Sequence, residues 1–225
     1  VAILHARRGT FSSAVASGLE TDVIERGSEV VFNRAYQVPM EDFSTLLDEV
    51  EEGQPDVVAG VGRIQDDLAL ARQIRSRGLR AEAVVLVVAG VAEFGRELGE
   101  LANGFMGPSQ WEPGASSTPE YGPTVEQLAL KHPGFALGGV DYAMAQAYAA
   151  GLVASRCVEE AGTLDPGALR KAAAKLDFTT FYGRFRIDPD TGLQVGRSVL
   201  LVQWQEGRKV VVWPPDAWEA EPVGF

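Results

Sequence analysis

The residues best suited to chemistry lie where a buried strand is expected to give way to a helix, in the loop Gly62-Arg63-Ile64-Gln65. The preceding run Val57–Val61 is apolar without polar alternation, which is typical of a strand covered on both faces of a parallel sheet. After the loop, Leu68, Ala71 and Ile74 recur at helical spacing. Ligands of open α/β sheets bind in such strand-to-helix loops. The loop is therefore a candidate site, although the alternative is that it serves only as a connection.

Residues that often carry catalysis are few and scattered. His5 and His132 are far apart, and the single cysteine, Cys157, lies in a helical pattern, where it is most often a small buried hydrophobe. The sequence has no Gly-rich phosphate loop, nucleophile elbow or metal-ligand spacing. The turn at Asp188 begins like a calcium loop, but Val199 stands where the last acidic ligand is needed. We therefore expect no enzyme, no cofactor and no metal site.

Composition excludes further classes of protein. The chain has 225 residues, 46% of them hydrophobic, which is enough for one large or two small domains. Its net charge of −11, without clustered Lys and Arg, makes it a poor partner for nucleic acid. No apolar run approaches the roughly 20 residues of a membrane span. The chain opens on Val1-Ala2-Ile3-Leu4, already strand-like and without a signal peptide, so we expect it to begin inside a larger fold.

Strands and helices alternate through the first half of the chain. We expect strands at residues 1–5, 29–36, 57–61, 83–88 and 104–107. We expect helices at residues 11–26, 41–52 and 92–101, and one after Gly62. This alternation predicts an α/β fold with a parallel sheet covered by helices. Phe11, Val15, Leu19 and Val23 form the apolar stripe expected to bury the first helix.

The pattern changes at Pro108. Residues 109–123 are rich in Pro, Gly, Ser and Thr and are expected to form a long connection. Helices are expected near residues 124–131 and 140–161, and a third begins at the cap Asp165-Pro166. The rest is predicted to be β structure, with strands at 181–187, 199–205 and 209–213. The turn at 205–208 predicts a C-terminal β-hairpin.

Short motifs along nearly the whole chain carry a family resemblance. In order, they are Phe11-Ser12-Ser13, Asp42-Phe43-Ser44, Pro55-Asp56-Val57-Val58, Gly99-Glu100-Leu101-Ala102-Asn103-Gly104, Ala145-Gln146-Ala147-Tyr148, Gly183-Arg184-Phe185-Arg186 and Val202-Gln203-Trp204-Gln205. In this order and spacing, the chain resembles the solute-binding proteins of ABC transporters of the branched-chain amino-acid type, which are type I periplasmic binding proteins. It is similar to the second half of such a protein.

The resemblance implies a two-lobed fold that closes on a ligand. Residues 1–113 would then form the core of the second ligand-binding lobe, and residues 114–180 a helical segment that completes the first lobe. Residues 181–225 would form the crossover and the hairpin that returns to the second lobe. The implied function is to bind a small amino-acid-like or organic-acid ligand and deliver it to a membrane permease. The implied location is the periplasm or the cell surface, as a lipoprotein. A ligand-sensing regulator with the same fold is the alternative.

The resemblance also places candidate ligand residues. The second lobe of the family contributes an aromatic residue at the first β–α turn, a residue at the third turn and an acid after the next strand. The positions that match or lie beside these are Thr10, Phe11, Arg63, Ile64 and Gly90, and Trp111 lies at the end of the fifth strand. Phe11 could instead be a core residue, Arg63 a solvated surface residue and Trp111 a plug in the lobe surface.

The types of these residues predict the ligand's charge. No acid occurs at residues 88–91, and Glu93 is the nearest one. A ligand ammonium in a cleft needs a carboxylate partner. Arg63 offers a planar fork that binds a carboxylate in bidentate fashion. We therefore expect a ligand with an anionic group and without an ammonium.

Overall fold

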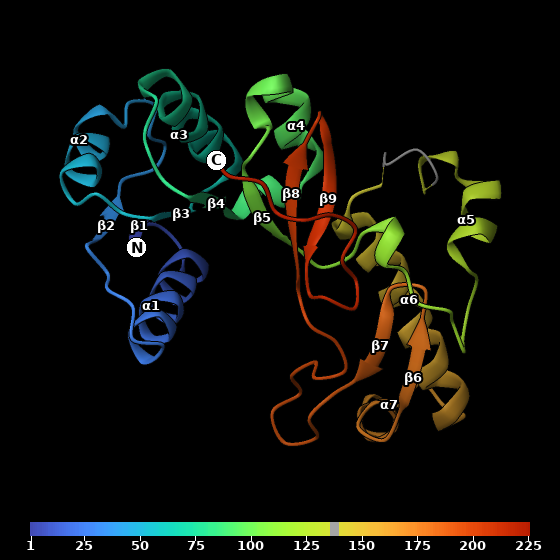
Figure 1. Ribbon diagram of the computed structural model, residues 1–225. Helices are drawn as coiled ribbons and strands as arrows, with labels where there is room; N and C mark the ends of the chain where they lie inside the picture. The colour runs from blue at the N-terminus through green and yellow to red at the C-terminus, as the bar shows by residue number, and fades with distance from the viewer. Residues whose placement is uncertain (136–139) are drawn as a thin grey trace. The chain divides into compact units, whose positions relative to one another are not determined.

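The computed structural model describes residues 1–135 and 140–225. The chain divides into two compact units (Figure 1). Unit 1 comprises Val1–Pro108 and Leu201–Phe225, and unit 2 comprises Ser109–Leu200. Each unit has its own cluster of buried apolar side chains.

Unit 1 is a helix-covered sheet. Its parallel strands are β1 (Ala2–Ala6), β2 (Phe32–Tyr36), β3 (Val57–Val61), β4 (Ala83–Leu86) and β5 (Met106–Ser109), and its antiparallel pair is β8 (Leu200–Gln205) and β9 (Arg208–Trp213). The strand order is β2-β1-β3-β4-β5-β8-β9. The predicted α/β fold, with a parallel sheet and a C-terminal hairpin, is confirmed.

Helices cover both faces of this sheet. They are α1 (Thr10–Glu25), α2 (Ser44–Glu52), α3 (Ile64–Arg77) and α4 (Ala92–Leu98), with the short 3₁₀ helices η1 (Val87–Gly90) and η2 (Gly99–Ala102). In Figure 1, α1 lies on one side of the sheet and α2 and α3 lie on the other. The expected α3 stripe of Leu68, Ala71 and Ile74 is buried, as are residues 58–61 of β3. The opening strand–turn–helix is therefore as predicted.

The predicted buried stripe of α1 is only partly confirmed, because Val23 is buried and Val15 and Leu19 are half-buried, but Phe11 is 62% exposed. The helix also buries Ser12 and Ala16, which were not predicted to face the core. Ser12 and Ala16 are small, so their face allows the helix backbone to approach β1 and β3 closely. The sequence prediction placed the larger side chains on the buried face and therefore missed this close approach. The consequence is that Phe11 projects from the first turn of α1 instead of filling the core.

The C-terminus of the chain is attached to unit 1 through an arginine. The Arg75 guanidinium lies 4.9 Å from the ring centre of Phe105 and 3.8 Å from that of Phe225. Arg75 also donates hydrogen bonds to the carbonyl of Leu101, at 3.2 Å, and to that of Asn103. A guanidinium stacked on two rings and bonded to two carbonyls is well fixed.

Unit 2 is mainly helical with one small sheet. Its elements are η3 (Pro113–Ala115), α5 (Val125–Lys131), η4 (Pro133–Phe135), α6 (Tyr142–Ala161), α7 (Pro166–Ala173), β6 (Asp177–Thr180) and β7 (Gly183–Arg186). The predicted cap is confirmed, since the Asp165 carboxylate accepts from the Ala168 amide at 2.9 Å. The expected strand at 181–187 starts later than predicted, and β6 was not expected. The two pair antiparallel with each other, around a turn at Phe181-Tyr182.

Candidate ligand-binding site

Three strand-end turns lie along one edge of the unit 1 sheet. β3 pairs in parallel with both β1 and β4, with His5 opposite Val61 and Gly60 opposite Leu86. The carboxyl ends of neighbouring parallel strands meet at one edge. The β1–α1 turn, the β3–α3 turn and the residues Val87–Gly90 of η1, called the β4–η1 turn below, therefore lie side by side there. They carry five of the six expected ligand residues, namely Thr10, Phe11, Arg63, Ile64 and Gly90.

The β1–α1 turn presents an exposed aromatic ring. Gly9 has a φ of 102°, a conformation that favours glycine, and directly precedes the helix. Thr10 and Phe11 form the first helical residues, and both are exposed. The first turn of α1 contains no acid, and no described side chain caps its amides. The turn therefore offers an apolar ring beside unpaired backbone N–H groups, which attract negative charge.

The β3–α3 turn presents an exposed cation. Arg63 is the N-cap residue of α3 and has extended backbone angles. Within residues 1–135 and 140–225, its side chain makes no recorded ion pair or hydrogen bond, and it is exposed. Ile64 beside it is partly buried against the unit 1 core. Arg63 is therefore available to a ligand at this edge.

A buried acid lies beneath the β3–α3 turn. Asp67 is fully buried, and its Oδ2 accepts from the Val88 amide of η1 over a long 3.4 Å. Burial raises the pKa of Asp67 from 3.8 to about 7, the Val88 and Gly62 amides oppose this rise, and Asp66 adds to it. Burial, and then the charge of Asp67, raises the pKa of Tyr36 well above its usual range. This carboxyl therefore gains or loses its proton near neutral pH.

The β4–η1 turn is held by side chains from three elements. Asp67 of α3 binds the Val88 amide, the indole N–H of Trp204 in β8 donates to the Ala89 carbonyl at 2.7 Å, and Lys209 of β9 donates to the Gly90 carbonyl at 2.8 Å. Successive backbone groups of the turn are thus fixed by residues far apart in sequence. Gly90 itself is buried, so this turn can contribute to a ligand site at the edge only through its backbone.

Trp111, the sixth expected residue, lies in unit 2. It is only 2% exposed and packs against Phe135, Phe181 and Tyr182, with ring centres 5.7–6.4 Å away. Its indole N–H donates to the Ser116 hydroxyl at 3.1 Å. The ring is therefore enclosed by unit 2, which favours packing over ligand stacking.

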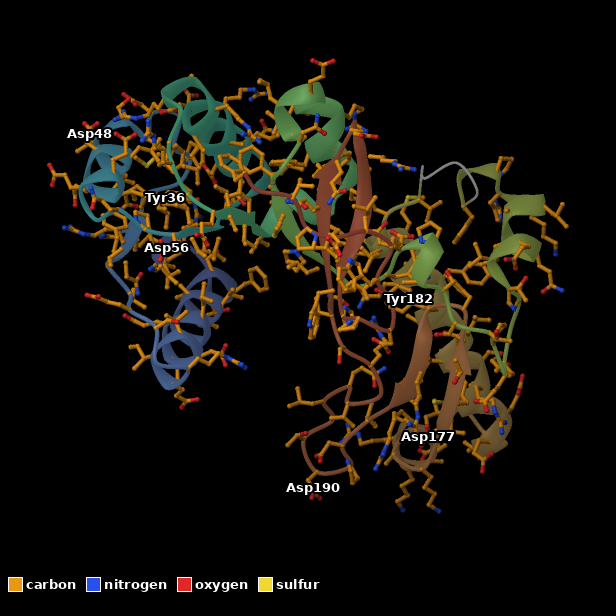
Figure 2. All side chains as sticks on the ribbon, viewed as in Figure 1. Tyr36, Asp48, Asp56, Asp177, Tyr182 and Asp190 are labelled. Carbon is orange, nitrogen blue, oxygen red and sulfur yellow. The ribbon has the colours of Figure 1, made fainter. Side chains whose placement is uncertain are left out.

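Two hollows lie away from this edge. One, of about 600 Å³, lies before β3 and β4 and is lined in part by Asp56, Arg77 and Arg80. Arg77 is already paired with Asp48 and Glu51 on α2, and Asp48 and Asp56 are labelled in Figure 2. Because ligands of parallel α/β sheets bind at the opposite, carboxyl ends of strands, we do not assign the site there.

The other hollow, of about 400 Å³, lies in unit 2 and is lined in part by Ala149, Ala150 and Ala154 of α6. Arg197, which also lines it, donates to the Gln110 carbonyl at 2.6 Å and lies 4.1 Å from the ring centre of Tyr182. Its guanidinium is therefore already engaged within unit 2.

The described part of the chain holds no group of three or more His, Cys, Asp or Glu side chains that could bind a metal ion. At the turn that resembles the start of a calcium loop, the Asp188 carboxylate accepts from the Asp190 amide and from the amide and hydroxyl of Thr191. The bond from the Thr191 amide is the main reason that the pKa of Asp188 is lowered. Among the described helices, none is both long and apolar enough to cross a membrane.

Sequence comparison identifies the family. A profile of the family described as periplasmic binding protein matches residues 1–209, nearly the whole chain. The chain belongs to this family. Unit 1, with its parallel sheet between helices and its antiparallel C-terminal hairpin, has the fold of a type I periplasmic-binding-protein lobe.

Solved structures share this fold at low sequence identity. The leucine-binding protein LivK of Thermotoga maritima is 21% identical over 96% of this chain, with a TM-score of 0.82. An amino acid ABC transporter substrate-binding protein of Pseudomonas fluorescens is 17% identical over 99%, with a TM-score of 0.75. An ABC transporter solute-binding protein of Rhodopseudomonas palustris, in complex with benzoate, is 17% identical over 94%, with a TM-score of 0.72. The chain spans 60%, 61% and 57% of these three structures, respectively.

Sequence reasoning missed Asp66 and Asp67 as part of the site. Both are almost fully buried, in the first turn of α3. The signal was present, since Asp67 precedes Leu70, Ala71 and Ile74 by three, four and seven residues and so shares their buried stripe. A carboxylate on a buried stripe needs polar partners, and the nearest available ones were the backbone amides of the neighbouring turns.

Proposed function

We propose that this chain forms part of the ligand-binding component of an ABC importer and holds a small organic anion at the carboxyl edge of the unit 1 sheet. The observation that carries the proposal is Arg63 at the start of α3, an exposed cation that has no side-chain partner among the described residues. Its neighbours at this edge are the exposed Phe11 ring and the β4–η1 turn. We expect a carboxylate to bind Arg63 and an apolar body to lie against Phe11.

The acids near this edge favour an anion over an amino acid. Asp67 is fully buried and Asp66 is 2% exposed, with its carboxylate accepting from the Met40 amide, so neither is available to a ligand ammonium. Glu93, in the first turn of α4, is half-buried and follows Gly90 by three residues in the chain. An ammonium left without a carboxylate loses an interaction of about 1.5–3 kcal/mol, similar to what Arg63 supplies to a carboxylate. The balance thus favours an organic acid.

The structural relatives support both parts of the proposal. Relatives with this fold are described as substrate-binding or solute-binding proteins of ABC transporters. The Rhodopseudomonas palustris relative is described in complex with benzoate, an aromatic carboxylate without an ammonium. The importer role implies a membrane permease as partner and a location outside the cytoplasmic membrane. It also implies that the chain binds its solute without transforming it.

Calorimetric titration of the full-length protein tests this function. The ligands are matched pairs, each an amino acid and the acid formed by removing its amino group, together with benzoate. We expect the acid of a pair to bind more tightly, by about tenfold or more, which corresponds to one charge-assisted hydrogen bond. A Glu93→Gln variant should leave this preference unchanged. Tight binding of leucine, with none of the corresponding acid, would refute the proposal.

A further inference from the structure

A ligand ammonium would need hydrogen-bond acceptors at the β4–η1 turn. Residues 88–91, at the end of this turn, contain no acid, so they could supply only backbone carbonyls. The two outer carbonyls already accept backbone donors. The Val88 carbonyl accepts from the Val91 amide at 3.1 Å, and the Val91 carbonyl accepts from the Phe94 amide at 3.2 Å. Binding of an ammonium here therefore depends on the two central carbonyls.

The C-terminal hairpin supplies side-chain donors to both central carbonyls. Trp204 of β8 and Lys209 of β9 lie directly opposite each other in the antiparallel pair, so their side chains leave the same face of the hairpin. The Trp204 indole N–H donates to the Ala89 carbonyl at 2.7 Å. The Lys209 ammonium donates to the Gly90 carbonyl at 2.8 Å. Every carbonyl of residues 88–91 thus accepts a donor, and one of these donors carries a full positive charge.

Strand β5 fixes the same turn from another side. A Cβ on Gly107 would lie 2.5 Å from the Gly90 nitrogen and 2.9 Å from the Ala89 carbonyl carbon, so the turn packs directly against this strand. The hairpin follows β5 in the sheet (Figure 1). Trp204 is 7% exposed and Lys209 is half-buried. The lysine charge is therefore held against a turn whose backbone has little room to move.

We propose that Lys209 is a specificity-determining residue, whose ammonium occupies the Gly90 carbonyl and excludes ligands that carry an ammonium. The inference rests on the proposed function, because the β4–η1 turn flanks the edge at which the ligand binds. An amino acid would bring a second cation to a turn that already holds one, and like charges in a partly desolvated site repel. An organic acid of the same shape brings no such charge, and Lys209 adds to the attraction that Arg63 exerts on its carboxylate.

Calorimetric titration of the full-length protein with the matched pairs measures this exclusion. The quantity compared is the preference, which is the Kd of the amino acid divided by the Kd of its deaminated acid. In Lys209→Met, which removes both the charge and the donor, the preference should fall by about tenfold, because the repulsion of the ligand ammonium is lost. In Lys209→Arg, which keeps the charge and the donors, the preference should stay within about twofold of the wild-type value.

A neutral donor separates the charge of Lys209 from its structural contact. Lys209→Gln keeps an N–H donor but lacks the charge, so its preference should fall as in Lys209→Met, and it gives the same comparison if Lys209→Met does not fold. A residue that only holds the turn acts on both members of a pair alike and leaves their ratio unchanged. The matched control is Arg208→Met, because Arg208 is exposed and precedes Lys209 on β9, so its side chain points to the other face. Its preference should equal that of the wild-type protein.

The outcomes separate this role from the proposed function. If the wild-type protein prefers the organic acid and both Lys209→Met and Lys209→Gln keep that preference, the role of Lys209 is overturned and the proposed function stands. A wild-type preference in Lys209→Gln alone, or an equal fall in Arg208→Met, also overturns the role. If the wild-type protein prefers the amino acid, the proposed function fails. A further tenfold shift towards the amino acid in Lys209→Met would then still support exclusion by Lys209, and an unchanged ratio would overturn it.

Discussion

Gly95 in α4 should be a position where a normally favourable substitution is unfavourable. Replacing a helical glycine with alanine usually stabilises a helix by up to about 1 kcal/mol. At Gly95, however, the new Cβ would lie 2.1 Å from Cη2 and 2.2 Å from Cζ3 of Trp204. These distances are far below van der Waals contact, so either the indole or α4 must move.

The indole is poorly placed to move. Trp204 is 7% exposed, and its N–H is bonded to the Ala89 carbonyl at 2.7 Å. Overpacking a core costs about 1–3 kcal/mol, and we expect the upper end because displacing the ring also strains a buried hydrogen bond. Set against the gain in helix propensity, Gly95→Ala should destabilise unit 1 by about 2 kcal/mol.

Gly18 provides the matched control. It lies in α1, and a Cβ there would meet no atom within 4 Å. The same substitution, Gly18→Ala, should therefore stabilise the protein by about 0.5–1 kcal/mol. Urea denaturation of both variants gives the comparison, provided that the slope with denaturant is unchanged.

A double-mutant cycle identifies the cause of the Gly95→Ala effect. Phenylalanine lacks the outer ring atoms that the new Cβ would strike, so the cost of Gly95→Ala should largely disappear in a Trp204→Phe background. If Gly95→Ala stabilises the wild-type protein as much as Gly18→Ala does, the packing that we describe between β8 and α4 is incorrect.

Three further predictions follow from unit 1. Between about pH 4 and 7, the Asp67 carboxyl is ionised in the unfolded protein but still protonated in the folded protein. The free energy of unfolding should therefore fall as the pH rises through this window, by up to about 1.4 kcal/mol per unit of pKa difference. Above this window it should level off. Asp67→Asn should lose this slope in urea titrations at several pH values, and an unchanged slope would contradict the raised pKa. Arg75→Lys should destabilise unit 1 by about 1–2 kcal/mol, because stacking on Phe105 and Phe225 is lost. The control Arg72→Lys, at an exposed neighbouring position, should not destabilise it. Equal melting temperatures of the two variants would refute the role of Arg75. Gly62→Ala should reduce soluble yield or lower the melting temperature sharply, because its Cβ would strike Asp67 and Tyr36. A variant with wild-type stability would show that the Asp67 and Tyr36 side chains do not pack closely against Gly62.

Local sequence signals specified much of unit 1. The apolar run in β3, the stripe of α3 and the turn at 205–208 each depend on neighbouring residues, and each is observed. At that turn, Glu206 and Gly207 have φ values of 51° and 79°, the left-handed conformation of a tight hairpin. Such features are predictable because the signal and the structure lie in the same short segment.

Features that depend on distant partners were not predictable in this way. The buried face of α1 is set by how closely the sheet approaches Ser12 and Ala16, and β6 is a four-residue strand that exists through its pairing with β7. At the site, the sequence indicated exposed groups such as Arg63. It did not indicate what holds the turns, because Asp67, Trp204 and Lys209 reach them from separate elements.

The central claim is that the ligand binds at the carboxyl edge of the unit 1 sheet, through Arg63. Two arginine variants test it directly in the full-length protein, because Arg63 lies at this edge and the exposed Arg80 lines the hollow at the opposite edge. Calorimetric titration with the best-binding organic acid should show Arg63→Ala weakened by about tenfold or more and Arg80→Ala unchanged. Unchanged affinity of Arg63→Ala, or loss of binding in Arg80→Ala, would contradict the account.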